Sequence, residues 1–191
     1  MKESNSILNL LSGFSHEKVN QLIELADYRK IESGIQLVKL GEVPTKVYFV
    51  ISGVVRCYIC TESGKEFNKN FYLPNSFLGS LTALITKKPS NLVFETLTSC
   101  KLYEIDFNKL MQMCKKSHEL SLLYSSILEY IYIKYEKRLV ELISLDAKDR
   151  YLELKSQIPD LDNLIPQYHI ASYLGITAVQ LSRIRKKLDS D

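Results

Sequence analysis

Basic side chains near the end of the sequence are spaced for contact with a nucleic acid. If residues 177–188, TAVQLSRIRKKL, form a helix, Arg183 and Lys186 share one face, opposite Leu181. An arginine can donate two hydrogen bonds to a guanine edge, and lysines neutralise phosphates. We therefore predict a DNA-reading face. Its residues are Thr177, Ala178, Val179, Ser182, Arg183, Lys186 and Lys187.

The residues around this stretch indicate how the face is held in place. Ala171 is small where two helices must cross, Gly175 suits a sharp turn, and Leu181 fills the wedge between the helices. Thr177 can cap the second helix, with Gln180 at the spacing of a capping box. Basic residues at the end of an ordinary helical hairpin also interact favourably with the helix dipole. The dipole does not explain the wedge pattern, so the sequence favours a helix-turn-helix.

Cysteine and histidine positions indicate neither a metal centre nor a catalytic group. Cys57 and Cys60 form a CxxC, but within a strand positions i and i+3 point to opposite faces. No second pair completes a ligand set, so we predict reduced structural thiols, no metal and no cofactor. A jelly-roll enzyme of the cupin class needs histidines on its strands, and residues 28–105 contain none. We predict that the chain is not an enzyme.

Composition indicates an ordinary globular chain. It has 191 residues, 46% of them hydrophobic, and a formal net charge of +3. The charge is too small to announce a nucleic-acid binder, so local clustering carries that prediction. The N-terminus has no apolar core typical of a signal peptide, and the most apolar segment, residues 120–133, contains Glu129. We expect a cytoplasmic protein that does not cross a membrane.

The middle of the chain reads as short strands between two helical regions. The strand runs are IQLVKL, KVYFVI, VVRCYI, EFNKNFYL, NLVFETL and CKLYEI, and glycines fall near their boundaries. Before them, residues 5–13 and 15–28 show helical spacing, with Ser15 as a candidate N-cap. After them, Asp106 can cap a short helix. The sequence thus predicts an α+β fold with an antiparallel β-roll or jelly roll.

A long helix over residues 119–145 carries two apolar stripes. One stripe is heptad-like and consists of Leu128, Tyr132, Tyr135, Leu139 and Leu142. The other consists of Leu120, Leu123, Ile127 and Ile131. Two stripes need two packing partners, which can be the chain's own β region and the same helix of a second copy. We predict a homodimer through the heptad-like stripe; the alternative is that both stripes are intramolecular core.

These features together resemble the Crp/Fnr family of transcriptional regulators. The segment VYFVISGVVRCY resembles the family's strand–turn–strand signature around a glycine, here Gly53. The C-terminal segment is similar to that of short-tailed members common in Bacteroidetes. The resemblance implies a cyclic-nucleotide-binding-type sensor in residues 1–118, a dimerisation helix in 119–145 and a DNA-binding domain in 146–191. Only three residues follow Leu188, so we expect no wing hairpin after the recognition helix.

The sequence departs from the family at the implied effector site. The glutamate that would bind a ribose hydroxyl falls on Ser80, and the arginine that would pair with the phosphate falls on Ser90. A buried cyclic phosphate would then lack a cation, with only Lys87 and Lys88 nearby. The implied site is Leu78, Gly79, Ser80, Leu81, Thr82, Ser90, Asn91, Leu92 and Tyr135. The N-terminus also lacks the cysteine cluster of the Fnr branch.

The sequence therefore predicts a homodimeric transcriptional regulator that binds double-stranded DNA. We expect its sensor domain to be degenerate and not to bind cyclic AMP with useful affinity. An effector, if one exists, would be an unknown small molecule. The alternative is a ligand-binding β-roll protein whose C-terminal helices bind a protein partner instead of DNA.

Overall fold

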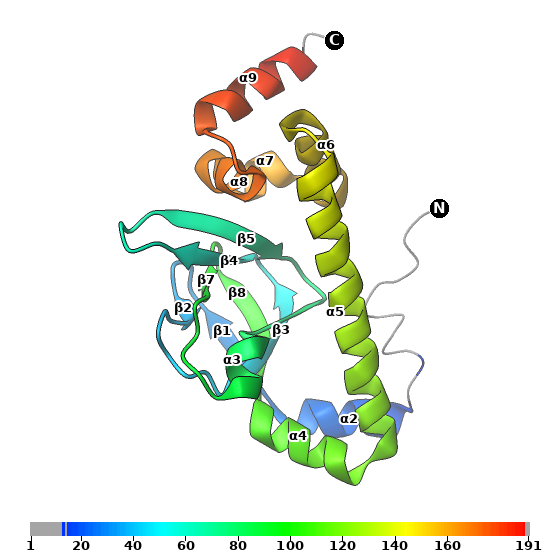
Figure 1. Cartoon of the computed structure of the whole chain (residues 1–191). Helices are drawn as coiled ribbons and strands as arrows, with labels where there is room; N and C mark the ends of the chain where they lie inside the picture. The colour runs from blue at the N-terminus through cyan, green and yellow to red at the C-terminus, as the bar shows by residue number, and fades with distance from the viewer. Residues whose placement is uncertain (1–12, 14, 190–191) are drawn as a thin grey trace.

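A computed structural model describes Gly13 and residues 15–189 of the chain, so most of the helix expected at residues 5–13 lies outside the described residues. A β-roll is flanked by a long helix along one side and by a group of C-terminal helices above it (Figure 1). This arrangement confirms the predicted α+β fold.

The β-roll consists of two four-stranded antiparallel sheets. The first pairs, in spatial order, β1 (Ala26–Ile31), β8 (Cys100–Asp106), β3 (Lys46–Ser52) and β6 (Ser76–Leu78). The second pairs β2 (Gln36–Val38), β7 (Val93–Thr96), β4 (Val55–Cys60) and β5 (Glu66–Tyr72). Side chains alternate across a strand, so each sheet turns one face inward, and Val50, Phe94 and Leu102 meet in a common core. All six predicted strand runs contain a strand.

Gly53, at the turn between β3 and β4, could not be another residue without strain. Its φ is +90°, and an added Cβ would lie 2.6 Å from both the Ser99 carbonyl oxygen and the Cys100 Sγ. The close approach of this turn to residues 98–100 therefore depends on the absence of a side chain.

The structure corrects the sequence reading at the start of the roll. Helix α2 (His16–Glu24) ends earlier than predicted, because Ala26–Ile31 pairs with β8 along its whole length as β1. Most of β1 is exposed, so the strand has no apolar alternation that would reveal it. The Ser15 side chain makes no capping bond; instead its backbone N–H donates to the Glu119 carboxylate at 2.9 Å. The short strand β6 and helix α3 (Leu81–Thr86) were also not predicted.

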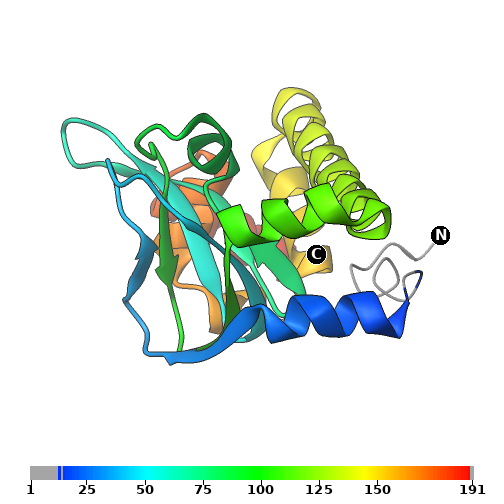
Figure 2. The ribbon, with the colours of Figure 1, turned by 90° about the horizontal axis from the view of Figure 1, so that it is seen from below.

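Two capped helices follow the roll. Asp106 accepts a hydrogen bond from the Lys109 backbone and begins α4 (Phe107–Lys116), as predicted. Ser117 caps α5 (His118–Ser144) in the same way, through the Leu120 backbone. Helix α5 runs the height of the roll, and α4 crosses its lower end beside α2 (Figures 1 and 2).

The two apolar stripes of α5 lie in different surroundings. Leu120 and Leu123 are buried against α4, and Ile127 packs beside them, so one stripe lies on the chain's own core. The heptad-like stripe is open: Tyr132 is 65% exposed and Leu139 is 57% exposed. One stripe is therefore intramolecular, and among the described residues the second stripe has no comparable cover.

The C-terminal helices are α6 (Ala147–Gln157), α7 (Leu161–Leu164), α8 (Gln167–Leu174) and α9 (Ala178–Leu188). The segment at 160–166 contains the one-turn helix α7, because Leu161 is fully buried in the core of this helical group. Val54 and Phe71 of the roll belong to the same apolar cluster. The helical group is therefore packed onto the roll, with α8 above β5 and α9 farther away (Figure 1).

Candidate nucleic-acid interface and effector site

Helices α8 and α9 meet as a tight helix-turn-helix. Gly175 ends α8 in the left-handed conformation, at φ +72°. Thr177 then caps α9: its hydroxyl accepts from the Gln180 backbone, and the Gln180 side chain accepts from the Thr177 backbone, which completes the predicted capping box. Leu181 is 0% exposed between the two helices, and Ala171 is buried at their crossing. The wedge arrangement inferred from the sequence is present.

The outer face of α9 is open to solvent along its length. All seven residues predicted to read DNA are exposed: Thr177, Ala178, Val179, Ser182, Arg183, Lys186 and Lys187. Arg185 is different, because its guanidinium forms an ion pair with Asp162 and lies over the Tyr151 ring. The basic residues of α9 therefore divide into one that holds the helix to the domain and three that face outward.

At the implied effector site the structure brings Ser80 and Ser90 together. The Ser90 Oγ lies 2.8 Å from the Ser80 Oγ and 2.8 Å from the Leu92 carbonyl oxygen, and it accepts from the Leu92 backbone N–H. Both serines are at most 2% exposed. A hydroxyl has one proton and two acceptor positions, so the Ser90 hydroxyl is saturated by its protein partners. Neither serine provides a charge for a phosphate.

Lys87 and the nearby aromatic side chains contact other parts of the chain. Lys87 donates to the Asn108 side chain at 2.6 Å, toward α4. Inside the roll the rings of Tyr72 and Phe94 pack 5.8 Å apart, centre to centre, among buried aliphatic side chains. Tyr135 reaches from α5 to β5, where Lys69 lies 4.5 Å from its ring centre and donates to its hydroxyl.

Of the remaining implied pocket residues, Leu78 is buried, Leu81 and Leu92 are half-buried, and Thr82 and Asn91 are exposed. Leu78, Gly79 and Leu81 also line an apolar cavity between the roll, α4 and α5.

A buried polar cluster, which the sequence reading did not single out, joins the roll to the helix-turn-helix. Arg56 on β4 is 5% exposed and forms ion pairs with Glu66 and Glu95, both on the roll. Its Nη1 also lies 3.2 Å from the His169 Nδ1 of α8, and so does the Asn68 Nδ2. Because both neighbours are donors, His169 Nδ1 must be the acceptor, and the imidazole is neutral with its proton on Nε2.

The charge state of His169 follows from these surroundings. The pKa of His169 is lowered to about 4: burial has the largest effect, the Arg56 charge also lowers it, and Glu66 acts in the opposite direction. The Asn68 Oδ1 is buried in the same cluster without a hydrogen-bond partner. One signal in the sequence pointed here: Arg56 is a charged residue inside the apolar strand run VVRCYI, and a buried charge requires partners.

Further bonds hold α8 to β5 and α5. The Asn68 backbone N–H donates to the Ser172 hydroxyl at 2.9 Å, and that hydroxyl donates to the Glu66 carbonyl oxygen. Arg138 of α5 donates to the Tyr173 carbonyl oxygen at 2.6 Å and stacks on the Tyr173 ring. The position of the helix-turn-helix is therefore defined by contacts with both the roll and the long helix.

No group of three or more metal-binding side chains occurs among residues 13 and 15–189. The four cysteines are free thiols, and burial raises the pKa of Cys57 to about 12, so this thiol is not activated. Within the described part of the chain, no helix is both long and apolar enough to span a bilayer.

The chain thus consists of a roll of two antiparallel sheets, a long helix and a helix-turn-helix. Residues 28–117 match the cyclic nucleotide-binding domain family. The CRP-like protein Clp of Xanthomonas oryzae pv. oryzae is 24% identical over 180 residues, which cover 85% of this chain and 77% of Clp.

Solved structures share the fold over most of the chain. The c-di-GMP responsive global regulator CLP of Xanthomonas campestris superposes with a TM-score of 0.68 at 20% identity, covering 93% of each chain. FixK2 from Bradyrhizobium japonicum gives a TM-score of 0.73 at 18% identity, covering 86% of this chain and 85% of FixK2. The chain is therefore similar to transcriptional regulators of the Crp/Fnr type, and residues 28–117 are similar to cyclic nucleotide-binding domains.

Because His169 is neutral in the folded protein, we predict that the free energy of unfolding depends on pH. The folded-state pKa of about 4 lies below the unfolded value of 6.5, so the contribution to stability is complete above pH 6.5 and is lost as pH falls toward 4. Between these values His169 should lower the free energy of unfolding by up to about 1.4 kcal/mol per pH unit. Urea denaturation over this range should show a smaller slope for His169→Gln. The matched control His118→Gln, at an exposed position, should keep the wild-type slope; equal slopes in all three proteins would contradict the cluster.

Proposed function

We propose that this chain regulates transcription by binding double-stranded DNA through the outer face of α9. The observation that carries the proposal is the exposed face itself. Arg183, Lys186 and Lys187 project outward from a helix held by a complete capping box and a buried Leu181, while Arg185 turns inward to Asp162. In this proposal Arg183 reads a guanine edge, Ala178 and Val179 touch thymine methyl groups, and the two lysines contact phosphates.

The proposed active form is a homodimer paired along α5. Its interface is Leu128, Tyr132, Tyr135, Leu139 and Leu142. Tyr132, Leu139 and Leu142 are 65%, 57% and 46% exposed, and neighbouring Ile143 is 78% exposed. A soluble monomer rarely leaves a large contiguous apolar surface in water, so these exposures support the interface. A twofold axis along α5 would also present two α9 helices to two half-sites.

In the proposed regulator the cyclic-nucleotide cassette is degenerate. The saturated Ser80–Ser90 pair supports this reading, because a cyclic phosphate would replace a satisfied neutral bond without meeting a cation. Any physiological effector is therefore a different small molecule.

The finer predictions belong to the same proposal. We assign the sensor to residues 1–118, the dimerisation helix to 119–145 and the DNA-binding domain to 146–191. The likeness to short-tailed Bacteroidetes members stays a prediction from the sequence. A DNA partner implies action in the cytoplasm.

Two substitutions on α9 test the DNA-binding proposal. Arg183→Ala should cost about 1–3 kcal/mol at one base pair and relax the preference there, because it removes base contacts. Lys187→Ala should weaken binding to all sequences about equally and reduce the salt dependence by about one charge, because it removes a phosphate contact. Fluorescence anisotropy with operator fragments selected from genomic DNA, at several salt concentrations, measures both. A wild-type protein that binds no DNA at low salt would favour the alternative, in which α8 and α9 bind a protein.

Charge placed in the α5 stripe should abolish dimerisation. Leu139→Glu combined with Leu142→Glu buries two carboxylates at the proposed interface, and unpaired buried charges are strongly unfavourable. Light scattering should report a monomer for this variant and a dimer for the wild type. A matched double variant, Leu40→Glu with Val43→Glu, changes two exposed apolar residues outside α5 and should remain dimeric. A folded stripe variant that stays dimeric would refute the assignment.

Cyclic AMP and cyclic GMP should not bind with useful affinity. The reason is the absence of both the ribose-binding carboxylate and the phosphate-binding cation at Ser80 and Ser90. Calorimetric titration of the full chain should give dissociation constants weaker than roughly 100 μM, or no heat of binding. A low-micromolar constant would show that a replacement cation exists, and Lys87→Ala and Lys88→Ala would then identify it.

A further inference from the structure

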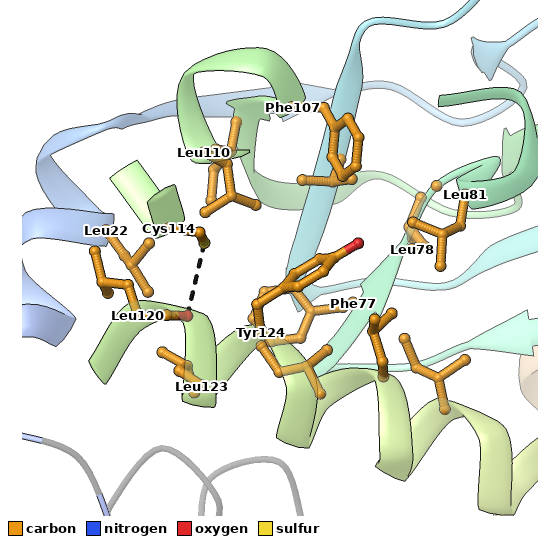
Figure 3. A pocket seen from close by; sticks show the side chains of 16 residues that line it. Leu22, Phe77, Leu78, Leu81, Phe107, Leu110, Cys114, Leu120, Leu123 and Tyr124 are labelled. Atoms are coloured by element: carbon orange, nitrogen blue, oxygen red, sulfur yellow. Dashed lines mark hydrogen bonds between the residues drawn. The ribbon is translucent and has the colours of Figure 1, made fainter. Parts of the chain in front are cut away.

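An apolar cavity of about 90 Å³ lies outside the cyclic-nucleotide cassette, between the roll and the helices α4 and α5. Phe77 and Leu78 of β6 form one wall, Phe107 of α4 another, and Leu123 and Ile127 of α5 a third (Figure 3). Every lining residue among the described ones has an apolar side chain or none, apart from Cys114 and Tyr124. No charged group reaches the cavity from the described part of the chain, so its walls suit an uncharged occupant.

Of the two polar groups, only Tyr124 is left without a partner. The Cys114 thiol donates to the Leu120 carbonyl oxygen, as the dashed line in Figure 3 shows. The Tyr124 ring lies across the cavity with its hydroxyl directed into the space between Phe107 and Leu78 (Figure 3). Among the described residues this hydroxyl makes no hydrogen bond, and it is not fully buried, so a ligand in the cavity can reach it. Burial raises its pKa, so it is present as the neutral phenol.

We propose that this cavity is a binding site for a small, uncharged, mainly apolar molecule that carries one hydroxyl or carbonyl group. The apolar body of the ligand packs among Phe77, Phe107 and Ile127, and its polar group exchanges a hydrogen bond with the Tyr124 hydroxyl. A phenolic hydroxyl can both donate and accept, so either kind of group is matched. The cavity is smaller than the roughly 150 Å³ space that accepts benzene in an engineered core, so a ligand with one ring enters only if the lining side chains shift.

The cavity shares its walls with elements through which a bound ligand can affect the rest of the molecule. Gly79 and Leu81 on its wall belong to the cassette loop, and Leu128 and Ile131 extend it along α5. Leu128 is also a member of the proposed dimer stripe. If α5 can occupy two positions, a ligand that binds more tightly to one of them favours that position. Because α5 contains the stripe and is followed directly by α6, the shift reaches both. This regulatory role rests on the proposed function, whereas the binding site does not.

The test uses a pair of probes of nearly equal shape, 4-methylphenol and toluene, with benzoate as a charged control. Calorimetric titration of the full chain without DNA should show binding of both neutral probes, and none of benzoate. The hydroxyl should make 4-methylphenol bind about three- to tenfold more tightly than toluene. Tyr124→Phe should remove that difference and leave toluene within about twofold of its wild-type affinity. Tyr130→Phe, on the same helix but away from the cavity, should behave as the wild type.

A second variant locates the site. Ile127→Trp fills the cavity and should abolish binding of both neutral probes; Ile127→Phe replaces it if thermal unfolding shows that the tryptophan variant is not folded. Dissociation constants above about 1 mM for both probes with the wild type would overturn the proposal, as would unchanged binding in a folded Ile127 variant. Equal loss of 4-methylphenol and toluene in Tyr124→Phe would refute the role of the hydroxyl. Failure of DNA binding alongside intact probe binding would remove the regulatory function and leave the site standing.

Discussion

The buried guanidinium of Arg56 is the constraint around which the rest of the molecule is arranged. A charge on a central strand requires compensation within its own surroundings, and Glu66 of β5 and Glu95 of β7 provide it from both neighbouring strands. The same group then presents a remaining N–H to His169 of α8. One side chain thereby fixes the pairing of three strands and the place where the helix-turn-helix rests.

Periodicity was enough to predict most of this architecture. The strand runs, the Asp106 cap, the two stripes of α5 and the turn at Gly175 each depend on a local pattern that survives folding. Features decided by distant partners were missed: β1 is a strand because β8 lies beside it, and α7 is helical because Leu161 is drawn into a core built by other helices. The polar cluster was missed for the same reason, since Arg56 and His169 are 113 residues apart.

The implied effector site and the cavity beside it are lined by neutral and apolar side chains. Where a nucleotide-binding relative would need an ionic partner, a neutral pair of serines closes on itself, and the neighbouring space is lined by leucine, isoleucine and phenylalanine. The candidate nucleic-acid face differs, because its basic side chains are exposed to solvent. The departure at Ser80 and Ser90 was predicted from the resemblance to the Crp/Fnr family, whereas the apolar cavity could be found only from the fold, because its walls come from segments between Leu22 and Ile131.

The bonds that cross from the roll to α8 have a further consequence for motion. Arg56 is neutralised entirely by carboxylates on the roll, and the groups contributed by α8, His169 and Ser172, are neutral. If the helix-turn-helix swings away, no ion pair of this cluster is broken and no unpaired charge is left behind. The joint thus behaves as a neutral hinge, whose opening depends on a few ordinary hydrogen bonds and on apolar contact, and hardly on ionic strength. A change in salt concentration should then leave the orientation of the helix-turn-helix relative to the roll unchanged.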